Sequence, residues 1–197
     1  GIYREGGTVE GQVLFIRAGK LQGNIGYSFD DNELPDERVL GEILTQFYYG
    51  ARFVPDEILL PVPLEDMQIR SEILTERKNK KVMVSAPKRG DKVRLVEMAT
   101  ENANQSFAEK RQTREQREKT IESLRRALRL TNAPKRIECF DISNIQGKMS
   151  VASMVVFDEG VPVKGSYRRY RIKTVEGADD FASMYEVLTR RYKRAVE

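Results

Sequence analysis

A chain of 197 residues, 40% hydrophobic and 32% charged, suits one or two domains with apolar cores and a highly charged surface. Its net charge of +4 is small, so an argument for nucleic-acid binding must rest on local clusters of basic residues. The single cysteine excludes an internal disulfide, and no apolar run approaches the roughly 20 residues of a membrane-spanning helix, so we expect a cytoplasmic protein with no membrane partner.

The first half of the chain alternates strand and helix patterns. An apolar strand over 12–17 turns at Ala18-Gly19 and returns over 20–29. Asp36 can cap a helix whose apolar residues recur at helical spacing up to Gly50. The pattern then predicts, in order, a strand over 57–61, a helix over 64–77, a strand over 82–84 and a long helix from Asp91.

The long helix is apolar in its first turns and far more polar from Glu109 to Lys119, where charge signs alternate. This stretch is either a solvated helix with neighbouring salt bridges or an arm that faces DNA. The sequence at 131–134, Thr-Asn-Ala-Pro, ends the helix and predicts a domain boundary. We therefore expect domains over 1–100 and 135–197, joined by a helical linker over 101–134.

Three successive strand patterns follow between Arg136 and Arg171. The first ends its apolar run on Asp141, and a carboxylate at the end of a buried strand is costly unless a partner such as a divalent cation compensates it. Residues 152–157 form a nearly continuous apolar run, which is typical of a strand covered on both faces. Cys139 lies in the first apolar strand, so we expect a buried, unreactive thiol.

The two halves of the chain share one plan: an apolar strand, a glycine turn, a returning strand, and a helix that begins at Asp36 or Asp180. The helix residues correspond at a constant offset, pairing Leu40 with Met184, Ile43 with Val187, Leu44 with Leu188 and Tyr48 with Tyr192. Any two α/β units can share such an order, but we interpret it as a structural duplication. The expected fold class is α/β, with RNase H-like mixed sheets and flanking helices in two modules, the second of them truncated.

Four stretches of the second half carry a family resemblance: Ile-Glu-Cys-Phe-Asp-Ile-Ser-Asn-Ile-Gln-Gly at 137–147, Val-Ala-Ser-Met-Val-Val-Phe at 151–157, Tyr-Arg-Arg-Tyr at 167–170, and the segment 179–192 that opens with Asp-Asp-Phe-Ala-Ser-Met-Tyr. Together with Gln-Val-Leu-Phe-Ile-Arg-Ala-Gly-Lys-Leu at 12–21, they resemble the UvrC family. The resemblance covers essentially the whole chain. It implies part of a subunit that incises damaged DNA in bacterial nucleotide excision repair.

The resemblance also implies site residues. Asp141 matches the family's catalytic aspartate on the first strand of an RNase H-like domain, which incises the damaged strand on the 5′ side of a lesion. Asp180 matches a second acidic position of that site, so both are candidate ligands for Mg²⁺ or Mn²⁺ in the complete protein. Asp179 is expected mainly to cap a helix. The family's Asp-Gly-Gly motif and its later histidine have no counterpart in this sequence, and Asn144 stands where many relatives have histidine.

Five residues are candidates for contact with DNA phosphates and bases: Tyr167, Arg168, Arg169, Tyr170 and Arg171. They could equally form an ordinary exposed strand face. The basic residues between Arg190 and Arg194 are expected to be solvated or to favour the helix C-terminus.

The implied partners are damaged double-stranded DNA and UvrB, the latter through a segment that we expect to lie outside this chain. An open sheet edge in the second module would also favour a dimer of this piece. An alternative function is a non-catalytic scaffold that holds protein or DNA surfaces. We expect residues 1–100 to be such a degenerate module, since Asp36 is the only acid of its own site that remains.

Overall fold

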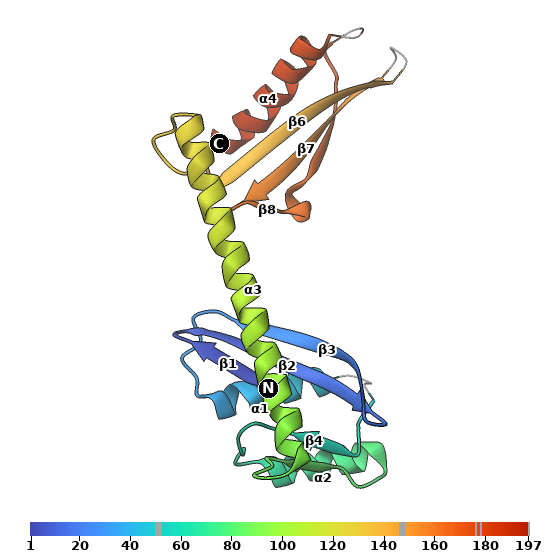
Figure 1. Cartoon of the computed structure of the whole chain (residues 1–197). Helices are drawn as coiled ribbons and strands as arrows, with labels where there is room; N and C mark the ends of the chain where they lie inside the picture. Colours follow the sequence, from blue (N-terminus) through green and yellow to red (C-terminus); the bar gives the residue numbers. More distant parts are fainter. Residues whose placement is uncertain (50–52, 146–148, 176, 178, 197) are drawn as a thin grey trace. The chain divides into compact units, whose positions relative to one another are not determined.

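The computed structural model describes residues 1–49, 53–145, 149–175, 177 and 179–196 (Figure 1). The chain divides into two compact units, Gly1–Gln112 and Thr113–Glu197. One helix, α3 (Asp91–Ala127), contributes residues to both of them. None of the helices in the described ranges is long and apolar enough to cross a membrane.

The described residues of unit 1 form two small sheets and three helical segments. An antiparallel sheet has the order β1-β2-β3, formed by β1 (Ile2–Glu5), β2 (Thr8–Arg17) and β3 (Lys20–Phe29). A parallel pair follows, formed by β4 (Glu57–Leu59) and β5 (Met83–Ser85). The helices are α1 (Asp36–Tyr48), α2 (Met67–Lys78) and the first part of α3.

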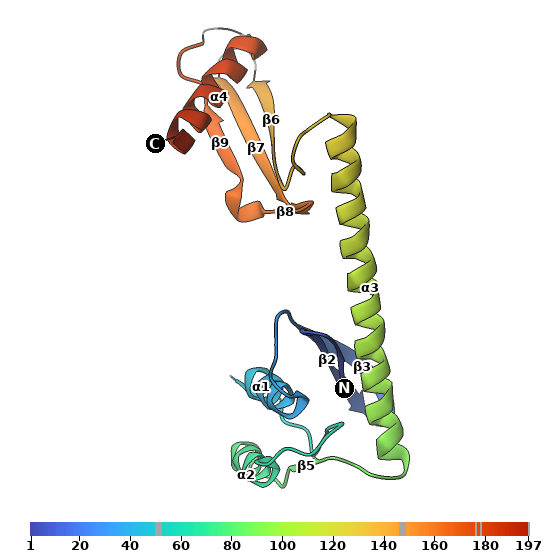
Figure 2. The same cartoon turned by 90° about the vertical axis from the view of Figure 1, so that its left-hand side faces the viewer.

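In unit 1 the antiparallel sheet lies between α1 and α3, as Figure 2 shows. Alternation along β2 turns Gly11 toward α1, where a Cβ on this residue would lie 2.5 Å from Cδ1 of Ile43. A side chain at this position would therefore force the terminal methyl of Ile43 to move, whereas glycine leaves room for it. The opposite face turns Glu10 toward α3, where Lys110 donates to both carboxylate oxygens at 2.8 and 2.9 Å.

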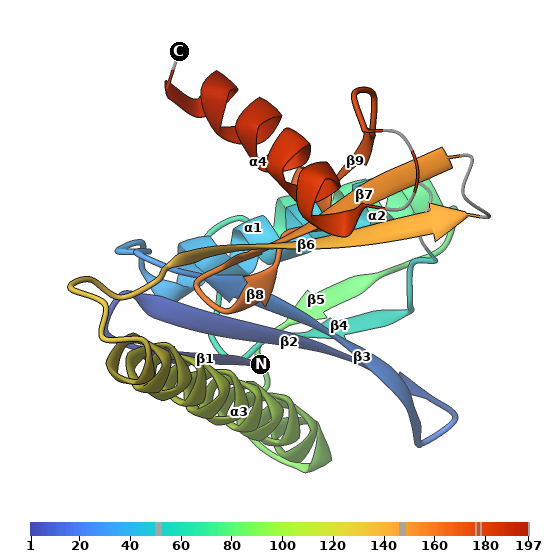
Figure 3. The ribbon, with the colours of Figure 1, turned by 90° about the horizontal axis from the view of Figure 1, so that it is seen from above.

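Unit 2 is built around β7 (Met149–Asp158). It pairs antiparallel with β6 (Arg136–Ile145) on one side, and with β8 (Val161–Pro162) and β9 (Arg168–Arg171) on the other. A single 3₁₀ turn, η1 (Lys164–Ser166), links β8 to β9, and α4 (Asp180–Val196) follows. Figure 3 shows α4 lying along one face of β6 and β7.

The two faces of the unit 2 sheet differ in burial. The helix face, under α4, buries Ala152, Met154 and Val156 to 2% exposure or less, and Val187 of α4 is fully buried. On the other face, which we call the open face, Cys139, Asp141 and Ser153 are exposed. The expectation that 152–157 is covered on both faces is therefore wrong for the described residues. The expected burial of Cys139 is also wrong, because strand alternation places its side chain on the face of the sheet that α4 does not cover.

The shared plan of the two halves is visible in the structure. Each long hairpin turns through two residues with positive φ: Ala18 (49°) and Gly19 (71°) in unit 1, Glu159 (46°) and Gly160 (76°) in unit 2. The helices that follow bury corresponding positions, Val39 and Ile43 in α1, Ser183 and Val187 in α4. The predicted α/β fold class with RNase H-like modules is confirmed. In unit 1 the antiparallel and parallel strands are hydrogen-bonded as separate sheets.

Element bounds shift by a few residues from the predicted ones. Asp36 does not cap α1: it is the first helical residue, after Pro35, and its Oδ1 accepts a hydrogen bond from Nε of Arg4 at 2.8 Å. The predicted end of this helix at Gly50 lies outside the described residues. Along 111–120 of α3 every residue is exposed, as expected of a solvated helix, and Arg114 pairs with Glu118 at 3.5 Å.

Candidate functional site

Asp141 lies on the open face of unit 2. Its register partner on β7 is Ser153, and Ser153 pairs in turn with Arg169 of β9. Side chains directly opposite each other in neighbouring strands share a face, so these three form one row across the sheet. The row brings an exposed carboxylate, a hydroxyl and a guanidinium to the same surface.

The other candidate acids lie at the start of α4. Oδ1 of Asp179 accepts a hydrogen bond from the amide of Ala182 at 2.9 Å, which confirms that Asp179 caps this helix. Asp180 is the first helical residue, and it is exposed.

The acids of the described residues do not form a metal site by themselves. Mg²⁺ prefers near-octahedral coordination by oxygen ligands, several of which are usually waters and substrate phosphates. No group of three His, Cys, Asp or Glu side chains in the described ranges could hold a metal ion. A site that includes Asp141 would need further ligands, from a segment beyond those described or from the substrate.

The basic and aromatic candidates divide between the two faces of the sheet. Tyr170 pairs with Ala152 and Arg168 with Met154, so their side chains belong to the helix face. Arg169 and Arg171 pair with Ser153 and Val151 and belong to the open face. Tyr167 precedes β9 and is half-buried at the end of η1. Only Arg169 and Arg171 therefore share a face with Asp141.

Glu138 joins β6 to α4, a role that sequence reasoning missed. Its side chain is only 7% exposed, and it accepts two hydrogen bonds from Arg191, at 2.7 and 3.0 Å, and one from Arg136 at 3.0 Å. These bonds, those from Arg191 first, hold the pKa of Glu138 below its usual range. The signal lay in the alternation with Phe140 and Ile142, because an acid at an inward strand position needs a cationic partner.

Glu186 anchors the segment between β9 and α4, and it was also missed. It is 8% exposed, and it accepts hydrogen bonds from the amides of Lys173 and Thr174 at 2.9–3.0 Å. The Thr174 hydroxyl donates at 2.7 Å and Arg190 at 2.9 Å. Burial acts to raise the pKa of Glu186, but the bonds from Thr174, Lys173 and Arg190 outweigh it and lower the pKa to about 2.

The side chains of two predicted positions lie outside the described part of the structure. Asn144 lies on β6 in register with Ser150, but its side chain is outside the described part of the structure. The same holds for the side chain of Arg194.

Comparison with known proteins links both units to one family. Residues 1–110 match the family model described as UvrC Ribonuclease H-like domain, and residues 125–197 match UvrC RNAse H endonuclease domain. The chain is 46% identical over 196 residues to a UvrABC system protein C of Syntrophotalea carbinolica. It is 46% identical over 193 residues to that of Geobacter metallireducens, and 44% over 197 residues to that of Protochlamydia amoebophila.

These alignments cover nearly all of this chain but only part of each relative. They include 98–100% of the chain and 31–32% of the three relatives. The chain therefore spans about a third of the length of the curated relatives that it matches.

Proposed function

The chain belongs to the UvrC family, and on that premise we propose that it is part of a DNA-repair endonuclease subunit. The subunit incises the damaged strand on the 5′ side of a lesion by metal-dependent hydrolysis of a phosphodiester bond. The observation that carries this proposal is the match of residues 125–197 to an endonuclease domain, together with an exposed aspartate, Asp141, on its first strand.

Asp141 supplies one metal ligand in the complete protein, and Asp180 is the second candidate. Mg²⁺ or Mn²⁺ is the expected ion, because hard cations take carboxylate oxygens and can orient water on a phosphodiester. The remaining ligands come from outside the described residues. Arg169 and Arg171 share the open face with Asp141, so they are the basic residues best placed to meet the DNA near the scissile bond.

The proposed partners follow from the same premise. Damaged double-stranded DNA is the substrate, and UvrB is the protein partner, bound through another part of the longer protein. The proposed subcellular location is the cytoplasm, where bacterial DNA is found.

A nicking assay on the complete protein tests the assignment of Asp141. Asp141→Asn should abolish the 5′ incision of a lesion-containing duplex in Mg²⁺, since the amide keeps the shape but loses the negative charge that binds a cation. Asp158→Asn is the matched control, because Asp158 is an exposed aspartate on the neighbouring strand, β7. Incision by Asp141→Asn at the wild-type rate would refute the proposal.

A second candidate function is a scaffold that holds protein or DNA surfaces without catalysis. It is favoured in unit 1, whose antiparallel sheet is covered by α1 and α3 and whose acid Asp36 is tied to Arg4. Substitution of Asp36 by Asn should leave incision by the complete protein unchanged, and a loss of incision with intact folding would count against this role.

A further inference from the structure

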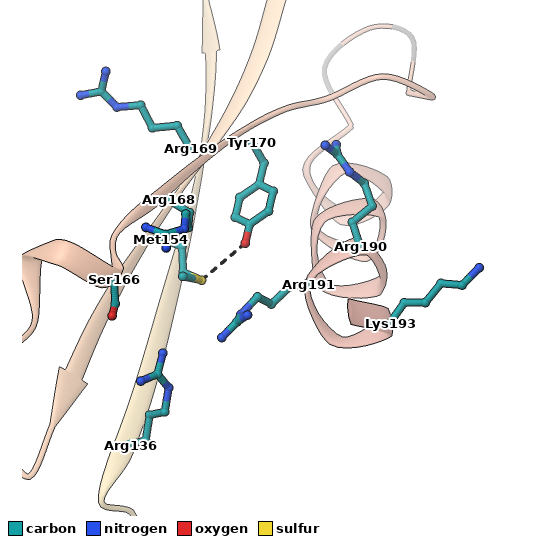
Figure 4. A pocket seen from close by; sticks show the side chains of 9 residues that line it. All are labelled: Arg136, Met154, Ser166, Arg168, Arg169, Tyr170, Arg190, Arg191 and Lys193. Carbon is teal, nitrogen blue, oxygen red and sulfur yellow. Dashed lines mark hydrogen bonds between the residues drawn. The ribbon is translucent and has the colours of Figure 1, made fainter. Parts of the chain in front are cut away.

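A strongly basic hollow lies on the helix face of unit 2, away from Asp141. It has a volume of about 550 Å³ and is lined by residues of β7, η1, β9, α4 and the start of β6. Arg169, whose strand position belongs to the open face, also borders it. Figure 4 shows its side chains: Tyr170 and Met154 form its floor, and Arg136 and Arg191 extend from β6 and α4 into the space below the Tyr170 hydroxyl. No acidic side chain lines it among the described residues.

The buried acids behind the hollow hold its arginines in place without neutralising them. Glu138 accepts hydrogen bonds from both Arg136 and Arg191. Arg168, the third arginine near the floor, donates to the carbonyl oxygens of Gly165 at 3.0 Å and Tyr167 at 2.8 Å. Within the described residues, these three guanidinium groups therefore share one carboxylate, which leaves a surplus of two positive charges.

On the side of the hollow formed by α4, a buried acid likewise holds an arginine in place. Glu186 binds Arg190, whose guanidinium carbon lies 5.8 Å from the centre of the Tyr170 ring. Such a cation–π contact holds both side chains in defined positions. Within the part of the chain that the structure describes, the hydroxyl of Tyr170 donates to Sδ of Met154 at 3.8 Å, which is a weak bond. It is available to a better acceptor that enters the hollow.

We infer that this hollow binds phosphodiester groups of a nucleic-acid strand, at a site separate from the Asp141 surface. Preordered guanidinium forks with surplus charge match the geometry and the charge of phosphate oxygens. The hollow is within the size range of small-ligand sites, about 300–1,000 Å³, so it has room for a phosphodiester group. The inference rests on the proposed function for its ligand class, but not on the role of Asp141.

The test is the binding of a 12-nucleotide fluorescein-labelled single strand to the 197-residue chain, followed by anisotropy at several salt concentrations. The double variant Arg136→Gln with Arg168→Gln should bind about tenfold more weakly. Loss of two phosphate contacts should also make the slope of log K against log salt shallower by about 1.4. Folding is checked by circular dichroism; Arg191 still pairs with Glu138 in this variant, so no buried acid is left without a cation.

Three further variants separate charge from geometry and one face from the other. Arg136→Lys with Arg168→Lys should keep the salt slope, because the charges remain, while losing part of the affinity with the guanidinium fork. Lys20→Gln removes one exposed charge at the hairpin turn of unit 1 and should change affinity less than twofold. Arg171→Gln probes the open face; if it weakens binding and the Arg136/Arg168 variant does not, the inference is overturned.

Two more measurements identify the ligand and keep the two proposals distinguishable. Inorganic phosphate at 10-fold excess over the oligonucleotide's phosphates should not displace the strand; full displacement would mean that the hollow holds free phosphate instead. Asp141→Asn should leave strand binding to the hollow unchanged. Loss of incision without loss of this binding supports both proposals, whereas wild-type incision by Asp141→Asn refutes only the nuclease assignment.

Discussion

Glu186 shows how one buried carboxylate can couple folding to pH. Its pKa is about 2 in the folded chain, against an ordinary value of 4.5, because the hydrogen bonds from Thr174, Lys173 and Arg190 outweigh the effect of burial. A depressed pKa in the folded state means that the group stabilises the fold fully above pH 4.5. This contribution is lost as the pH falls toward 2, when the carboxylate takes up a proton.

We therefore predict that Glu186→Gln destabilises unit 2 at pH 7 by about 2 kcal/mol, the usual scale for hydrogen bonds to a charged group. The difference between the wild type and the variant should shrink as the pH falls from 4.5 to 2. Urea unfolding monitored at several pH values measures both effects. Glu159→Gln is the control, because this exposed acid makes only a 3.5 Å pair with Lys135 and should change stability by less than about 0.5 kcal/mol. A pH-independent difference for Glu186→Gln would contradict the assigned pKa.

At the scale of elements, the two hairpins use the same turn with different chemistry. Both need two successive residues with positive φ, the type I′ geometry that suits the twist of the strands. Glycine occupies the second position in each, but the first holds Ala18 in unit 1 and Glu159 in unit 2. A residue with a Cβ is strained there, by about 1 kcal/mol, unless its side chain tolerates the left-handed region as asparagine does.

Ala18→Asn should therefore raise the stability of unit 1 by about 0.5–1 kcal/mol. Ala18→Val is the matched control with the opposite expected sign, since a β-branched side chain is least tolerant of positive φ. It should lower the stability of unit 1 by at least as much as Ala18→Asn raises it. Thermal unfolding of the two variants beside the wild type measures both shifts. If valine is tolerated as well as asparagine, the left-handed conformation of Ala18 is not retained in solution.

The local sequence pattern was enough to predict the order of the elements. It did not predict which face of the unit 2 sheet is covered by α4. The turn at Ala18-Gly19 and the helical spacing of Met184 and Val187 are local signals, and they were interpreted correctly. The face covered by α4 depends on contacts between distant segments. Valines occur on both faces of 151–157, so the alternation between buried and exposed positions is not apparent from the sequence. Ser153 is the one polar residue that indicates it.

The same limit applies to the candidate site. The sequence pointed to Asp141, but it did not separate Arg168 from Arg169, whose side chains belong to opposite faces because they are neighbours in one strand. The buried acids Glu138 and Glu186 were not recognised as anchors, because their partners come from α4 and from the loop before it. Register, which fixes these relations, is a property of the folded sheet.

At the scale of the whole molecule, the arrangement of the acids bears on whether this chain can cleave DNA by itself. The described residues hold no group of three potential metal ligands, and the sequence contains no histidine. We predict that the purified 197-residue chain does not nick a lesion-containing duplex above background in Mg²⁺ or Mn²⁺. The complete protein under the same conditions is the positive control. Metal-dependent nicking by the chain alone, abolished by Asp141→Asn, would show that its own residues suffice.

The outer edge of β6 leads to a prediction about association. In the described part of the chain β6 pairs with β7 alone, so its other edge presents backbone N–H and C=O groups with no strand beside them. Such an edge favours pairing with a second chain, above all on a ten-residue strand with apolar side chains. We expect the 197-residue chain to self-associate as its concentration rises through the micromolar range, as measured by sedimentation velocity.

The edge itself can be tested through Cys139, which is exposed on β6. Cys139→Lys should reduce association, because a lysine on an edge strand carries charge into the approaching strand. Cys139→Ser should associate as the wild type does, which excludes a disulfide between chains as the cause. Ser153→Lys places the same charge on the open face of the central strand β7, away from the edge, and should leave association intact. A chain that stays monomeric while its β6 amides are strongly protected from exchange would mean that another segment already covers this edge.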